Sequence, residues 1–236
     1  DRLEEGFCRL TGRRYAVACS SGTAALCLAL RGLTFGPGHR VVSQAYTCDA
    51  ASLASWNVTG GSPVVLPVED ETWSLSVGAL SRWLDNQSNH GDIVVLLAHI
   101  YGVPARDTQE IVALCRRRGI PLIEDASEAH GASIGHRPVG SFGDVSVFSC
   151  RSEKLISGGQ LGLLVTDDAQ VARRARQWGE SGLPAHSVRY WSSVPGMNFQ
   201  PSHLNAALAC AQLERLPELV EARRRRHGGW RERLEK

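Results

Sequence analysis

The most informative residue in this sequence is a single internal lysine. The chain has 236 residues and 26 lysines and arginines, yet its only lysines are Lys154 and the last residue, Lys236. A guanidinium stays protonated, so arginine cannot replace a lysine that acts as a neutral amine. The retained Lys154 is therefore a candidate nucleophile that forms a Schiff base with a carbonyl carbon. The plain alternative is a solvent-exposed loop lysine.

Two other segments could hold a ligand beside such a lysine. Ser20–Ala25 follows a short apolar run, and the N–H groups at the start of a helix there could bind a phosphate. Ser and Thr also cap helices without any ligand. Ile123–Ala126 carries Asp125 at the end of another apolar run, where open α/β sheets bind ligands. A carboxylate there could keep a pyridinium nitrogen protonated, although an Asp can also simply begin a loop.

Short apolar runs that alternate with helical segments must position these residues. We expect strands at Arg14–Cys19, Arg40–Ser43, Pro63–Leu66, Ile93–Ala98, Ile120–Glu124, Asp144–Phe148 and Leu161–Thr166. We expect helices at Asp1–Thr11, Ala24–Leu33, Asp49–Trp56, Val77–Leu84, Thr108–Arg118, Ala169–Trp178 and Ser202–Arg226. This alternation predicts βαβ units and an α/β fold. A mostly parallel central sheet would be flanked by helices in three layers.

The composition excludes several classes of protein. A net charge of +2 indicates no nucleic-acid partner, and no apolar run is long enough to span a membrane. The seven cysteines lack metal-ligand spacing, so the sequence predicts no metal site and a reducing, cytoplasmic compartment. An NAD-binding domain is disfavoured because no G-x-G-x-x-G follows a strand.

Five segments together carry a family resemblance. They are Ala18–Leu26 (ACSSGTAAL), His99–Pro104 (HIYGVP), Leu122–Ala132 (LIEDASEAHGA), Gly140–Lys154 (GSFGDVSVFSCRSEK) and Pro195–Leu216 (PGMNFQPSHLNAALACAQLERL). The sequence resembles the DegT/DnrJ-type nucleotide-sugar aminotransferases, which have the aspartate-aminotransferase fold and use pyridoxal 5'-phosphate (PLP). The resemblance implies that residues 1–236 are the PLP-binding large domain of a longer chain, cut at both ends and without its small C-terminal domain.

The resemblance also assigns roles to single residues. It implies that Lys154 is the Schiff-base lysine and that Asp125 pairs with the pyridine nitrogen. Phosphate contacts are implied for Gly22, Thr23, Ala24 and Ser149. Cys48 takes the place of an aromatic residue against the ring, and Glu128 takes the place of a Gln near the phenolic oxygen. Asn198 would reach the cofactor of a neighbouring subunit, which implies a homodimer with shared active sites.

The implied reaction moves an amino group from L-glutamate or L-glutamine to a keto sugar, in most relatives a nucleotide-linked one. Lys154 would act as base and acid, while His130 and His99 would position loops rather than carry protons. A PLP-dependent sugar dehydratase is disfavoured because those relatives carry His in place of the lysine. A cyclitol or aminobenzoate aminotransferase stays open.

Three positions depart from the family pattern. They are Cys48, the turn Gly159–Gly162 with Gln160 and Leu161, and Gln200. These departures bear on substrate choice more than on cofactor binding. They also allow a decayed, inactive copy. The altered glycine turn and the missing C-terminal domain are the support for the second class of function, a non-catalytic PLP-fold protein with a regulatory or scaffold role.

Overall fold

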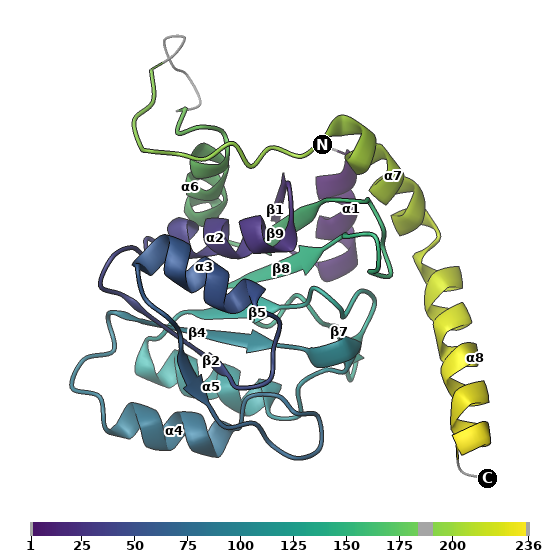
Figure 1. Cartoon of the computed structure of the whole chain (residues 1–236), viewed down its shortest axis with the longest axis horizontal. Coiled ribbons are helices and arrows are strands. Elements are labelled where there is room, and N and C mark those ends of the chain that lie inside the picture. Colours follow the sequence, from purple (N-terminus) through teal and green to yellow (C-terminus); the bar gives the residue numbers. More distant parts are fainter. Residues whose placement is uncertain (1, 184–190, 235–236) are drawn as a thin grey trace.

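The computed structural model describes residues 2–183 and 191–234, in which a central sheet lies between layers of helices (Figure 1). The strands are β1 (Tyr15–Cys19), β2 (Arg40–Gln44), β3 (Val64–Leu66), β4 (Ile93–Ala98), β5 (Leu122–Asp125), β6 (Ser133–Ile134), β7 (Arg137–Pro138), β8 (Val145–Ser149) and β9 (Gly162–Thr166). The helices are α1 (Arg2–Thr11), α2 (Gly22–Gly32), α3 (Ala50–Thr59), α4 (Val77–Asp85), the short 3₁₀ helix η1 (Ile100–Gly102), α5 (Thr108–Arg118), α6 (Ala169–Gly179), α7 (His203–Glu214) and α8 (Leu216–Leu234).

The seven-stranded sheet has the order β1-β9-β8-β5-β4-β2-β3. Strands β3, β2, β4, β5 and β8 pair in parallel, which confirms the prediction of a mostly parallel sheet. Strand β9 runs antiparallel to both of its neighbours, β8 and β1. The segment between β8 and β9 contains no crossover helix, so the chain returns in the opposite direction.

Alternate residues of the strands face opposite helical layers, which confirms the three-layer fold. On one face, Val94 and Leu96 of β4 pack in the same buried cluster as residues of α2, α3 and α6. On the other face, Val95 and Leu97 pack beneath α4 and α5. Beyond β5, this second face is covered by α1 and α7, which bury Phe148 of β8. The continuous apolar runs are thus strands covered on both sides.

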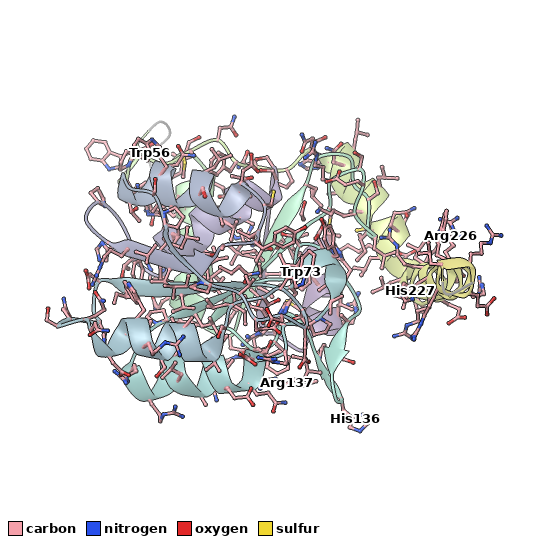
Figure 2. All side chains as sticks on the ribbon, turned by 60° about the horizontal axis from the view of Figure 1, so that its bottom comes forward. Trp56, Trp73, His136, Arg137, Arg226 and His227 are labelled. Carbon is pink, nitrogen blue, oxygen red and sulfur yellow. The ribbon has the colours of Figure 1, made fainter. Side chains whose placement is uncertain are left out.

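The predicted helix Ser202–Arg226 is wrong as a single element. The chain forms α7 and α8, with a break at Arg215 between them. Pro217 lies at the second residue of α8, and a proline lacks the N–H that a continuous helix would need and clashes with the preceding turn. Of α8, only Leu216 is buried, and the helix projects from the body of the domain (Figures 1 and 2).

Two further features complete the described structure. Strands β6 and β7 form a small antiparallel hairpin that the sequence did not predict, with His136 at its projecting tip (Figure 2). Within residues 2–183 and 191–234, no helix combines the length and the apolar character needed to cross a membrane.

Candidate active site

A cavity of about 530 Å³ lies where the carboxyl ends of the parallel strands meet the start of α2. Seven of the predicted site residues line it: Gly22, Thr23, Cys48, Asp125, Glu128, Ser149 and Lys154. The strand register explains this convergence, because Asp125 at the end of β5 pairs with Ala98 of β4 and with Val147 of β8. The structure therefore brings together, on one cavity, segments that lie between Ser21 and Gln160 along the chain.

The start of α2 forms an anion cradle at one end of the cavity. Ser21 caps the helix, and its side chain accepts a hydrogen bond of 3.1 Å from the backbone N–H of Ala24. The N–H groups of Gly22 and Thr23 have no partner within the helix, because they belong to its first turn. A side chain at position 22 would place its Cβ only 2.9 Å from the Cβ of Ser149. These groups fit a phosphate held at a helix N-terminus.

Register across three strands brings the cradle against Ser149. Gly162 of β9 pairs with Ser149 on one side and with Cys19 on the other. The turn after Cys19 therefore runs directly over Gly162, where an added Cβ would lie 2.1 Å from the carbonyl oxygen of Ser21 and 2.7 Å from the nitrogen of Gly22. The turn Gly159–Gly162 departs from the family pattern, but it keeps Gly162, the glycine that this close contact requires.

We expect Gly162→Ala to weaken cofactor binding. The new methyl group would push the Ser21–Gly22 turn away from β9, and such overpacking costs about 1–3 kcal/mol. Titration with PLP, followed by absorbance, measures the change in affinity. Gly228→Ala is the matched control, because nothing lies within 4 Å of its added Cβ. Equal PLP affinity in both variants would contradict this role for Gly162.

Asp125 supplies a buried carboxylate to the lining of the same cavity. The residue is 8% exposed, and its Oδ1 accepts a hydrogen bond of 3.0 Å from the backbone N–H of Ser127. Burial raises the pKa of Asp125, and the hydrogen bonds from Ser127 offset this only in part. A cation bound against the carboxylate would stabilise its charged form. The site thus fits the protonated ring nitrogen of a pyridine.

Lys154 reaches the cavity from the loop after β8. Its Nζ lies 2.9 Å from Oε1 of Glu128 and 3.9 Å from a carboxylate oxygen of Glu153, and its side chain is 17% exposed. The other oxygen of Glu128 accepts a hydrogen bond of 2.8 Å from the backbone N–H of Tyr101. A partly shielded amine that points into a cavity, held by one carboxylate, is placed to attack a carbonyl group.

Glu124, which precedes Asp125 in β5, is the centre of a buried hydrogen-bond network, here called the hub. This network fixes the end of the strand that carries Asp125. The Glu124 carboxylate accepts hydrogen bonds from the backbone N–H groups of Gly140 (2.7 Å), Phe142 (2.8 Å) and Gly143 (3.1 Å), and from Oγ of Ser146 (2.8 Å). It also lies 3.0 Å from Nε2 of His99. Burial alone would raise the pKa of Glu124, but the hydrogen bonds from His99 and the backbone lower it to about 2.

The two histidines of the conspicuous motifs, His99 and His130, are both buried. Nδ1 of His99 accepts a hydrogen bond from the N–H of Ala105, so its Nε2 carries the proton that it donates to Glu124. His130 packs against the rings of Phe7 and Phe148. Neither of its ring nitrogens has a partner in the described part of the chain. Burial lowers the pKa of His130 to about 3, so the residue is neutral in the folded chain.

His130 should make the fold sensitive to mild acid. Its pKa is 6.5 in the unfolded chain and about 3 in the folded one, so its stabilising contribution is complete above pH 6.5 and falls as the pH drops toward 3. Between pH 7 and pH 5 we expect a loss of about 2 kcal/mol in the free energy of unfolding. Urea unfolding across this range should show that His130→Leu removes the slope. His136→Gln, at the exposed hairpin tip, should leave it unchanged, and the same slope in all three proteins would contradict the assignment.

Two predicted residues lie outside the cavity lining. Ala24 is buried behind the cradle, with its N–H bound by Ser21. Asn198 forms an isolated antiparallel bridge with Glu180. The predicted phosphate contacts of these two residues stay predictions. Sequence reasoning missed Tyr101 and Arg151, which line the cavity together with Tyr46. They follow closely on the carboxyl ends of β2, β4 and β8, and that position was the signal that could have found them.

Comparison with known proteins places this geometry in a family context. The family model described as "DegT/DnrJ/EryC1/StrS aminotransferase family" matches residues 1–236. The chain is 33% identical over 223 residues to GDP-perosamine synthase of Escherichia coli O157:H7, a match that covers 94% of this chain and 59% of that protein. It is 35% identical over 224 residues to the putative pyridoxal phosphate-dependent aminotransferase EpsN of Bacillus subtilis (strain 168), with 94% of this chain and 57% of that protein covered.

A solved structure shows the same fold. The DegT DnrJ EryC1 StrS aminotransferase from Brucella abortus matches with a TM-score of 0.89 at 26% sequence identity, over 99% of this chain and 62% of that one. The chain therefore spans about three fifths of the length of the relatives that it matches.

Proposed function

Because this chain belongs to the DegT/DnrJ/EryC1/StrS aminotransferase family, we propose that residues 1–236 form the cofactor-binding large domain of a PLP-dependent sugar aminotransferase. The observation that carries the proposal is the convergence of Lys154, Asp125 and the start of α2 on one cavity. A decayed protein of this fold would not need to keep an amine, a buried carboxylate and an anion cradle in contact with the same space. The same convergence disfavours a scaffold role.

Each group has a defined task in this proposal. The N–H groups of Gly22 and Thr23, with the Ser149 hydroxyl, hold the phosphate of PLP. Asp125 would keep the pyridine nitrogen protonated, and in that state PLP would supply an electron-withdrawing ring next to the reacting carbon. Lys154 would hold the cofactor through its amine and would take and return a proton as base and acid. Glu128 orients the Lys154 amine through the contact of 2.9 Å.

We further propose the substrates. The donor is L-glutamate or L-glutamine, and the acceptor is a keto sugar linked to a nucleotide. The donor carries a carboxylate and the acceptor carries phosphate, and Arg151 on the cavity lining offers a guanidinium to either group. A sugar dehydratase is disfavoured because Lys154 occupies the position where those relatives carry His.

The proposed assembly is a cytoplasmic homodimer. Asn198 supports it, because this residue belongs to the family motif yet lies outside the cavity of its own subunit. Its side chain is then free to approach the cofactor of a second copy.

The decisive test is spectroscopic. Full-length protein mixed with PLP should show an absorption band at about 420 nm that borohydride fixes to the chain. L-Glutamate should remove the band in the absence of a sugar, and addition of the keto sugar should restore it. L-Glutamine is tested beside it, with D-glutamate as the control. A folded protein without the band would overturn the enzyme assignment and favour a non-catalytic PLP-fold protein.

A further inference from the structure

Three exposed aromatic side chains lie at or next to the Lys154 cavity, and the ring of Tyr46 contacts the other two. Tyr46, Trp73 and Tyr101, here called the aromatic rim, are 38%, 53% and 73% exposed. The ring centroids of Tyr46 and Trp73 are 5.2 Å apart, and those of Tyr46 and Tyr101 are 6.3 Å apart. Tyr46 and Tyr101 line the cavity, whereas Trp73 does not. Trp73 (labelled in Figure 2) therefore extends the rim outward from the cavity.

The backbone at two of these residues is strained. Trp73 has a φ of 54° and Tyr101 a φ of 53°. A bulky side chain rarely adopts this left-handed region. Such strain persists only where the surrounding structure enforces it, and it gathers at ligand sites. Trp73 and Tyr101 both carry this strain and both contact Tyr46. This combination indicates a ligand site rather than three unrelated surface side chains.

Polar contacts enforce the strained positions. The N–H of Tyr101 donates to Glu128, the carboxylate that also holds Lys154, and the Tyr101 hydroxyl lies 2.9 Å from that of Tyr46. On the other side, the Glu69 carboxylate accepts hydrogen bonds from the backbone N–H groups of Glu71 (2.8 Å), Thr72 (3.0 Å) and Ser74 (3.3 Å). These hydrogen bonds hold together the turn that contains Trp73. The rim is thus ordered before any ligand arrives, which reduces the entropy cost of binding.

The rim is not a requirement of the hydrophobic core. Its three side chains remain exposed, and Trp73 belongs to none of the buried clusters of the described residues. Trp56 offers a contrast on the same molecule. It is 61% exposed on the surface of α3, carries no backbone strain, and lies away from Trp73 (Figure 2).

The chemistry of the proposed substrate indicates which of its groups would bind the aromatic rim. In the proposed function, on which this inference rests, the keto carbon of the sugar must reach the cavity that holds Lys154. The nucleoside diphosphate attached to that sugar then extends out of the cavity, past Tyr46 and Tyr101. A nucleobase has a flat π-face that stacks on aromatic side chains. We propose that the aromatic rim binds the nucleobase of the acceptor substrate, with Trp73 as the main stacking residue.

The expected effect falls on one substrate only. Loss of one base-stacking side chain weakens binding by roughly 5- to 150-fold. We therefore expect Trp73→Ala to raise the Kd for free uridine, guanosine or thymidine 5'-diphosphate by this factor, whichever of them the wild type binds. The KM for the nucleotide-linked keto sugar should rise by a similar factor. Trp73→Phe should retain most of the affinity, because it keeps an aromatic face.

The experiment uses the full-length, PLP-loaded protein with calorimetric titration of the three nucleoside diphosphates. The absorption band and its removal by L-glutamate should be unchanged in Trp73→Ala, because neither involves the nucleotide. The KM for the same keto sugar without a nucleotide should also be unchanged. Trp56→Ala is the matched control and should behave as the wild type in every assay.

Three outcomes would overturn the inference. They are a wild type that binds none of the three diphosphates, an equal loss of affinity for the linked and the unlinked sugar, and dissociation of an oligomer by Trp73→Ala without any change in diphosphate binding. The last would make the rim an interface between copies of the chain. Failure of the proposed function is a separate result, since it would appear in the wild type as a missing band or a missing response to L-glutamate.

Discussion

Replacement of Lys154 with alanine is expected to abolish the absorption band at about 420 nm and the borohydride-stable attachment of PLP. Within residues 1–236 the only other lysine is Lys236. Loss of proton transfer alone should lower turnover by about 10²- to 10⁴-fold. The measurements are the spectrum, mass spectrometry after borohydride treatment, and the rate of amino transfer.

Lys154→Arg is the matched control for charge. It preserves a cation opposite Glu128, but a guanidinium cannot be deprotonated to attack a carbonyl. We expect it to retain the fold and to lose the band as completely as Lys154→Ala does. A borohydride-stable PLP adduct in either variant would have to lie at another residue, and it would show that Lys154 has been misassigned.

Replacement of Asp125 with asparagine is expected to lower turnover by about 10²- to 10³-fold, the usual effect of losing one electrostatic contact to the reacting system. The amide can still accept the hydrogen bond that Ser127 donates, so the site should keep its shape. It carries no negative charge, however, and cannot hold a pyridine nitrogen in its protonated state. The rate of band removal by L-glutamate measures this effect directly, and Asp125→Glu is the control that keeps the charge.

The same variant should have the opposite effect on the cofactor-free chain. Burial raises the pKa of Asp125, so its ionised form destabilises the folded chain, and stability from this group increases as the pH falls below the folded pKa. Asp125→Asn removes that charge. We expect the cofactor-free variant to unfold at higher urea concentration than the wild type at pH 7, and we expect PLP to stabilise it less. A variant that is less stable without PLP would mean that Asp125 has a structural role.

The amino-acid sequence by itself determined the class of fold and the main chemical groups. The apolar run Ile93–Ala98 is a strand covered on both faces, and the helix Thr108–Arg118 lies where the periodicity and the stop at Gly119 predict it. Asp125 lies at the end of β5, and Lys154 lies in the loop after β8. Hydrophobic spacing and caps are local features that involve only a few neighbouring positions. The scarcity of lysine is instead a property of the composition of the whole chain.

Only the tertiary structure decided how these residues meet their partners. Glu128 and Lys154 are 26 positions apart, and Tyr46 and Trp73 are 27 positions apart. The hub at Glu124 brings together groups from several loops. Sequence periodicity describes which face of an element is apolar, but it carries no information on which loop will lie opposite another. The register of β8, β9 and β1 placed the anion cradle, and the strained turns fixed the aromatic rim. Both arise from contacts between segments that are distant in the sequence. These contacts contribute to the free energy of folding only once the whole sheet has formed.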